Sequence, residues 1–292
     1  MIETRGLVKR YGSKTALDQI DLDVPDGAVY GLVGPNGAGK TTLLGLLAGL
    51  RKPTEGMIVV RADPSKIGVL PDTPRFDPWL TAREVVELAR SLTTSSGGSD
   101  RVDDVIEEAG LANDADRRVG GFSRGMLQRL GIAATVVGDP ELLMLDEPSS
   151  ALDPMGRREV LDLVSRLRGQ ATVLFSSHIL GDVQEVSDIV GILNRGRLLY
   201  QGPIHDLLVG KATPVYTLRV RSDPEVVAET LLGESWVTGV KVSPPDTLRV
   251  SVTGVERAEQ AFPAFLAGAG VPVISLAPEA VDLEQVFLEL TT

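Results

Sequence analysis

One short stretch decides the fold of this sequence, and it reads Gly34-Pro35-Asn36-Gly37-Ala38-Gly39-Lys40-Thr41. It matches the pattern GxxxxGK[ST] of a phosphate-binding loop. The glycines let the backbone curl so that its N–H groups converge on phosphate oxygens, and a helix starting near Lys40 aims its positive dipole end at the same anion. Lys40 can then reach the β and γ phosphates of a nucleotide, and the Thr41 hydroxyl can ligate Mg²⁺. We expect phosphate contacts from this whole stretch and from the adjoining Thr42.

The residues on both sides of this loop support that interpretation. Ala28 to Val33 is a short apolar run, and Lys40 to Ala48 has a helical pattern that Gly49 ends. A strand, a glycine-rich loop and a helix in this order begin an α/β nucleotide-binding unit. The alternative, a glycine-rich turn with a chance lysine, does not account for these flanks.

A second motif places two carboxylates at the end of a predicted buried strand. Leu142 to Leu145 are apolar, and Asp146 and Glu147 follow them directly. Ligands bind at the carboxyl ends of strands in open α/β sheets. We expect Asp146 to hold Mg²⁺ and Glu147 to orient the attacking water or accept its proton. The alternative is a pair of acidic residues that merely solvate a strand end.

A third motif, Gly121-Phe122-Ser123-Arg124-Gly125-Met126-Leu127-Gln128-Arg129, is less common. Ser123 is a good helix N-cap. Gly125 in the first turn costs roughly 0.8–1.0 kcal/mol of helix propensity, which indicates that another group approaches the backbone closely. Taken alone, the motif also fits a plain capped helix.

Composition and charge exclude several classes of protein. The chain has 292 residues, of which 43% are hydrophobic and 24% charged, which is the balance of an ordinary globular protein. It has no cysteine, so thiolate chemistry and disulfides are impossible. No apolar stretch approaches the ~20 residues needed to span a bilayer, and the first residues lack the pattern of a signal peptide. The net charge of −11 argues against nucleic-acid binding and against a polybasic grip on lipid. Attachment to a membrane would therefore need a protein partner.

The pattern of predicted elements changes after Gly210. Before it, strands and helices alternate, which favours a mainly parallel sheet. After it, short strands and helices predict a small α+β domain without an evident catalytic constellation. We therefore expect two domains, residues 1–210 and 211–292. The polar stretch 93–99 is expected to be an exposed loop within the first domain.

The three motifs, in this order, resemble those of the ATP-binding cassette (ABC) ATPases over residues 1 to about 210. The resemblance implies an α/β fold of the P-loop NTPase class. Such a nucleotide-binding domain has a RecA-like core, an antiparallel β subdomain and a helical subdomain, here followed by the small C-terminal α+β domain. It also implies roles for further residues. Tyr11 would stack on adenine, and His178 would be the switch histidine. The signature would comprise Ser123, Arg124, Gly125 and Met126, and Ser149-Ser150-Ala151-Leu152-Asp153 would cross the dimer interface, with Asp153 near the nucleotide. By themselves, Tyr11 also fits strand-edge packing and His178 a structural histidine.

Two positions depart from the usual family pattern. Arg124 and Met126 replace a glycine and a glutamine of the LSGGQ signature, and Asp72 stands where a glutamine is usual. A carboxylate at position 72 can still ligate Mg²⁺, together with Thr41 and Asp146. These variants, and the tail 281–290, resemble the exporter branch whose permease is a separate chain.

The resemblance implies an ATPase that uses ATP and Mg²⁺, with Lys40, Glu147 and His178 as catalytic residues. Two copies would face head to tail as a homodimer, with each ATP between the P-loop of one copy and the signature helix of the other. Closure and opening of this dimer would energise export through a separate transmembrane permease at the cytoplasmic face of the cell membrane, with no nucleic acid involved. Two alternatives stay open: a non-transport ABC ATPase that acts on nucleic acid or the ribosome, and a regulatory nucleotide binder that does not hydrolyse.

Overall fold

The computed structural model describes residues 1–93, 100–150, 152–211, 214–279 and 283–291. The chain forms two compact units, one that runs from Met1 to His205 and one from Asp206 to Leu290. The division lies inside helix α7 (Ile204–Lys211), close to the boundary proposed at residue 210. Of the loop predicted at 93–99, residues 94–99 lie outside the described ranges.

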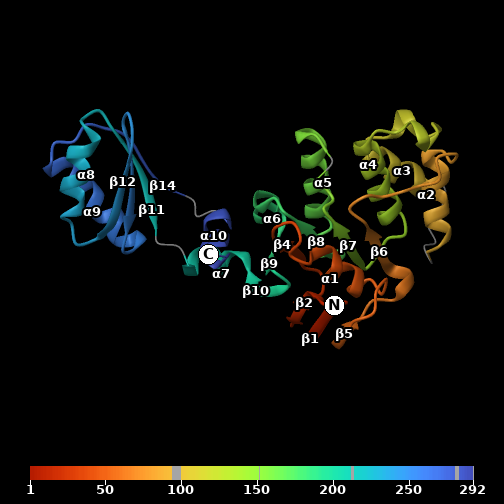
Figure 1. The fold of residues 1–292 in the computed structure, drawn as a ribbon. Coiled ribbons are helices and arrows are strands. Elements are labelled where there is room, and N and C mark those ends of the chain that lie inside the picture. Colours follow the sequence, from red (N-terminus) through yellow and green to blue (C-terminus); the bar gives the residue numbers. More distant parts are fainter. Residues whose placement is uncertain (94–99, 151, 212–213, 280–282, 292) are drawn as a thin grey trace. The chain divides into compact units, whose positions relative to one another are not determined.

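A six-stranded sheet is the centre of the first unit (Figure 1). Its strand order is β10-β9-β4-β8-β7-β6, and every pair except the β9–β10 hairpin is parallel, which confirms the predicted mainly parallel sheet. The hairpin turns at Arg195 and Gly196, both of which have positive φ as a type I′ turn requires. The strands are β4 (Val29–Val33), β6 (Ile67–Leu70), β7 (Leu142–Asp146), β8 (Thr172–Ser177), β9 (Ile189–Asn194) and β10 (Arg197–Pro203).

A smaller antiparallel sheet precedes and flanks the central one. It contains β1 (Ile2–Tyr11) and three strands that each pair with it: β2 (Lys14–Ile20), β3 (Asp23–Val24) and β5 (Glu55–Val60). The alternation of Ile20, Leu22 and Val24 predicts a single strand, but the chain forms two strands here, β2 and β3, which both pair antiparallel with β1. The buried Thr4 hydroxyl bridges Ile20 O and Leu22 N at 2.8 Å each, where the regular ladder is broken. The three apolar side chains are nonetheless buried, as their alternation predicts.

Helices complete the first unit in two groups. The group next to the sheet comprises α1 (Lys40–Leu47), α5 (Pro154–Arg166) and α6 (Leu180–Val186). The second is a helical layer of α2 (Ala82–Ser91), α3 (Asp100–Glu108) and α4 (Arg124–Val136), which pack on one another, with short 3₁₀ turns at Pro64–Lys66, Ala112–Asp114 and Val119–Gly121. A capping box begins α2, since the side chains of Thr81 and Glu84 each accept a hydrogen bond from the other residue's backbone N–H.

The second unit has the element order βαββαβ and an antiparallel sheet ordered β12-β13-β11-β14, which is a ferredoxin-like arrangement. Helices α8 and α9 lie on the same side of that sheet (Figure 1). Phe262 of α9 is fully buried, with its ring centroid 4.7 Å from Trp236 and 5.0 Å from Tyr216. The elements are β11 (Val215–Val220), α8 (Pro224–Leu232), β12 (Val237–Ser243), β13 (Thr247–Val252), α9 (Val255–Gly268), β14 (Val273–Pro278) and the terminal α10 (Leu283–Thr291).

None of the helices in the described ranges combines the length and apolar character that a bilayer span needs.

Candidate nucleotide site

A cavity of about 790 Å³ lies at the carboxyl end of the central sheet of the first unit. The P-loop lines it between β4 and α1, from Pro35 to Thr42. The starts of β2 and the β9–β10 turn form other parts of its wall. The cavity therefore occupies the place where strand ends and a helix N-terminus meet, as the sequence predicts.

Two glycines allow the P-loop to adopt its path. A Cβ on Gly34 would lie 2.1 Å from the backbone oxygen of Leu193, so a side chain cannot fit there. Gly39 has a φ of 114° and is the N-cap of α1, a conformation that L side chains rarely adopt. Glycine at these two positions therefore allows the backbone path by which the loop reaches Lys40, the first residue of α1.

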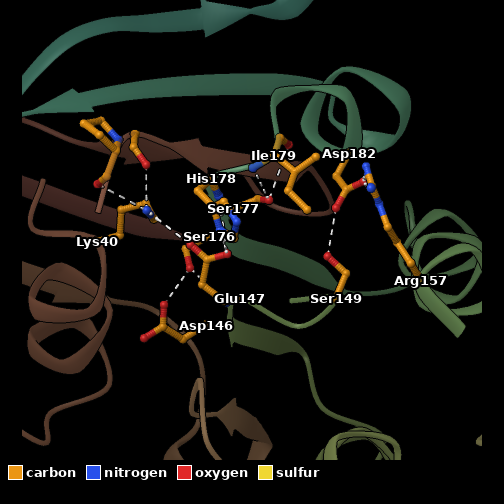
Figure 2. A network of polar contacts seen from close by, with 12 residues as sticks. Lys40, Asp146, Glu147, Ser149, Arg157, Ser176, Ser177, His178, Ile179 and Asp182 are labelled. Carbon is orange, nitrogen blue, oxygen red and sulfur yellow. Dashed lines mark hydrogen bonds and ion pairs between the residues drawn. The ribbon is translucent and has the colours of Figure 1, made fainter. Parts of the chain in front are cut away.

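Lys40 is 6% exposed, and its ammonium lies inside the curl of the loop. Nζ donates to the carbonyl oxygen of Gly34 at 2.7 Å and forms an ion pair with Glu147 Oε1 at 3.2 Å (Figure 2). A buried ammonium that lines the cavity with the P-loop is of the chemical type that binds phosphate oxygens.

Glu147 is the residue directly after β7, and it has a φ of 50°, in the left-handed region that non-glycine residues rarely enter. Its backbone N–H donates to Ser176 Oγ at 3.0 Å. Its second carboxylate oxygen is 2.7 Å from His178 Nδ1. Strained backbone of this kind concentrates at functional sites, where neighbouring contacts hold it in place.

Asp146, the other predicted carboxylate, is 5% exposed. The Ser176 hydroxyl donates to its Oδ1 at 2.6 Å. Ser176 is thus a site residue that the sequence reasoning missed. Asp146 in β7 and Ser176 in β8 pair in register, so their contact depends on which strands become neighbours, and no local pattern indicates it.

The structure brings most of the predicted residues to this one cavity. Tyr11, Asp72, Arg124, Glu147 and His178 line it together with the P-loop. The Tyr11 ring is 45% exposed, and Arg51 donates to its hydroxyl at 2.8 Å. Arg124 lines the cavity of its own chain, whereas the family resemblance implies contact with the nucleotide of a second copy.

Six other predicted residues are not part of the described cavity lining. Gly34 and Asp146 are each next in the chain to a lining residue, and the other four are Ser123, Gly125, Met126 and Asp153. Ser123 Oγ accepts a hydrogen bond from the N–H of Met126 at 3.2 Å and caps α4. Asp153 Oδ1 accepts from the N–H of Gly156 at 2.8 Å and caps α5. Within the chain these two side chains therefore serve as helix caps, while Ala151 of the same predicted interface loop lies outside the described residues.

Residues 17–150 match the family model described as ABC transporter. The uncharacterized ABC transporter ATP-binding protein YxlF of Bacillus subtilis is 40% identical over 231 residues, which cover 77% of this chain and 78% of that protein. The bacitracin transport ATP-binding protein BcrA of Bacillus licheniformis is 39% identical over 71% of each chain. The daunorubicin resistance ATP-binding protein DrrA3 of Streptomyces coeruleorubidus is 35% identical and covers 99% of this chain and 95% of its own.

A solved structure described as the ATP-binding subunit of an ABC transporter superposes with a TM-score of 0.67 and 26% identity, over 72% of this chain and 92% of that one. The similarity in sequence therefore extends to the fold, and the predicted P-loop NTPase cassette is confirmed. The chain belongs to the ABC transporter ATP-binding proteins, the subunits that bind and hydrolyse ATP.

Proposed function

We propose that the cavity holds ATP with Mg²⁺ and that Lys40, Glu147 and His178 carry out its hydrolysis. The observation that supports this most strongly is the convergence of these three side chains. Lys40 lies 3.2 Å from one carboxylate oxygen of Glu147, and His178 lies 2.7 Å from the other. Each comes from the segment after a different strand of the parallel sheet, β4, β7 or β8.

In this proposal, phosphate binding and activation of Glu147 are coupled. The ammonium of Lys40 exchanges the Glu147 carboxylate for phosphate oxygens, which carry more negative charge. The released carboxylate then orients the attacking water and accepts its proton. His178 holds the other carboxylate oxygen of Glu147 in place. Since it also lines the cavity, it would contact the γ-phosphate of the bound nucleotide.

Mg²⁺ would be held by oxygen donors, which are the ligands it prefers. Thr41 and Asp72 both line the cavity, and Asp146 lies at the end of β7 beside Ser176. One or two carboxylates and a hydroxyl fit this ion, because Mg²⁺ keeps several waters and takes its remaining ligands from the nucleotide phosphates. The metal would neutralise charge on the phosphates.

We also propose that two copies assemble head to tail around two ATP molecules. Ser123, Gly125, Met126 and Asp153 would then face the nucleotide of the other copy, since they are not part of their own cavity lining. The backbone N–H groups at the N-terminus of α4 form a site for an anion that a second copy would supply. Tyr11 would stack on the adenine.

The assembled dimer would energise export through a separate permease. Relatives carry names that state bacitracin transport and daunorubicin resistance. A cell that transports a toxic compound outward becomes resistant to it, so these names favour export. The chain would lie at the cytoplasmic face of the cell membrane, held there by the permease through the region near Asp72.

The test is Glu147→Gln. We expect ATP hydrolysis to fall by about 10²- to 10⁴-fold, the range that a general base contributes, while ATP binding persists. ATP-bound dimer should accumulate and be visible by light scattering. Glu141→Gln, which changes a carboxylate just before the amino end of β7, should hydrolyse ATP normally. Normal hydrolysis by Glu147→Gln would remove Glu147 from the mechanism.

A further inference from the structure

Two segments leave the carboxyl ends of the neighbouring strands β7 and β8 and are joined repeatedly (Figure 2). We call residues 146–149 the carboxylate segment and residues 176–182 the histidine segment. Ser176 bonds Asp146 and Glu147 N, and His178 bonds the Glu147 side chain. These inner contacts lie at the nucleotide cavity.

A further contact joins the same two segments away from the cavity. The Ser149 hydroxyl donates to Asp182 Oδ2 at 2.8 Å, and Asp182 belongs to α6 of the histidine segment. The Arg157 guanidinium from α5 binds the other oxygen, with Nε 2.5 Å from Oδ1. Figure 2 shows the Asp182 carboxylate between Ser149 and Arg157.

The Asp182 carboxylate is 1% exposed, and Ser149 is 4% exposed. Removing a carboxylate from water costs several kcal/mol unless it is paired and hydrogen-bonded, and here both oxygens are. Because apolar residues of similar volume often replace such pairs without loss of stability, stability alone is a weak reason for a buried ion pair. A fixed geometry between three separate elements is a stronger one.

We propose that Asp182 is a positioning residue for hydrolysis. Its carboxylate holds the carboxylate segment, the histidine segment and α5 in one arrangement, and so sets the position of Glu147 relative to His178. Asp182 does not belong to the described lining of the cavity, so it acts through Glu147 and His178. The inference rests on the proposed roles of those two residues. It adds a link from them to α5, whose N-cap Asp153 ends the predicted interface loop.

The experiment compares Asp182→Asn with Asp188→Asn in the full chain. Asp188 also pairs with an arginine, Arg168, at 3.0 Å, and accepts from the N–H of Val29 at 2.9 Å, at the amino end of β4. It is a control for the loss of an arginine partner at the opposite end of the sheet, although it is 38% exposed and Asp182 is 1% exposed. For Asp182→Asn we expect kcat for ATP to fall at least 10-fold, with the Kd for ATP changed less than 2-fold. Asp188→Asn should keep the wild-type kcat. Thermal unfolding of both variants reports the purely structural effect.

A double variant tests the path of the effect. If Asp182 acts through Ser149, then Ser149→Ala with Asp182→Asn should hydrolyse ATP no more slowly than Asp182→Asn alone. Arg157→Lys keeps a cation beside Asp182 and should retain more activity than Arg157→Ala. The inference is overturned if Asp182→Asn keeps its kcat, or if it loses kcat only as far as its folded fraction falls.

Glu147→Gln, measured alongside, separates this inference from the proposed function. If Glu147→Gln abolishes hydrolysis while Asp182→Asn leaves it intact, only the positioning role fails. If Glu147→Gln hydrolyses ATP normally, the proposed function fails first.

Discussion

The two units of this chain place their strand ends in different ways. In the first unit, β4, β7 and β8 are neighbours and parallel, so their carboxyl ends meet at one edge and deliver Lys40, Glu147 and His178 together. In the second unit all paired strands are antiparallel, so successive strands end at opposite edges. A parallel sheet therefore concentrates functional side chains, whereas this antiparallel one disperses them.

The ion pairs of the two units also differ, in whether they line a cavity or join strands to one another. Lys40 and Glu147 are 6% and 13% exposed and line a cavity, where a ligand can replace the contact between them. In the second unit, Arg249 of β13 pairs with Glu279, which follows β14, and Arg219 of β11 pairs with Asp246. No cavity comparable to that of the first unit contains these pairs within the described residues, and they join strands to one another. The comparison predicts that substitutions in the second unit change the free energy of unfolding. Substitutions at the carboxyl edge of the sheet in the first unit should instead change ATP binding or hydrolysis.

The largest effect is expected from Phe262→Ala. Phe262 is fully buried against Trp236 and Tyr216, so its truncation should destabilise the second unit by about 3–5 kcal/mol. Chemical denaturation followed by Trp236 fluorescence measures this. ATP affinity should be unchanged, and Val226→Ala, at a side chain that is 60% exposed, should alter stability by less than about 0.5 kcal/mol. A parallel loss of ATP binding would show that the two units depend on each other.

A smaller effect is expected from Lys40→Ala. Loss of a charged hydrogen-bond donor to phosphate should weaken ATP binding by about 10- to 150-fold, or ~1.5–3 kcal/mol. Titration calorimetry with ATP gives the affinity. Lys66→Ala is the control, because Lys66 donates to Gly138 O and Asp139 O and is not part of the described cavity lining. Equal affinities for the two variants would contradict the role of Lys40.

The smallest effect is expected from acid, in the second unit. A hydrogen bond from Arg249 holds the pKa of Glu279 below its ordinary value of 4.5, and Thr217 adds another. Because the folded pKa is the lower one, the stabilisation is complete above the ordinary value and is lost as pH falls through the folded value. Denaturation between pH 7 and pH 3 should show this decline. Glu279→Gln should show a flatter profile, and an unchanged profile would exclude Glu279 as its source.

Most of the functional elements could be predicted from local patterns. The P-loop spacing, the apolar run before Asp146 and the N-cap serine of α4 each specify one element through a short-range rule. The strand predicted from Ile20 to Val24 was interrupted because Thr4, distant in sequence, offers a competing side-chain partner to the backbone. Ser176 and Asp182 were missed for a similar reason, since their contacts are with residues far along the chain.

The sequence by itself determined the nucleotide-binding class, because phosphate recognition needs glycines, a lysine and a hydroxyl at fixed spacing within one loop. It also determined the strand that carries Asp146 and Glu147. The tertiary structure alone decided that Lys40 lies between Glu147 and the Gly34 carbonyl, and that Arg124 lies at its own chain's cavity. It also decided that Asp182 is clamped by Ser149 and Arg157. Such contacts depend on which strands become neighbours, and that order is set by the packing of the whole sheet rather than by any local spacing.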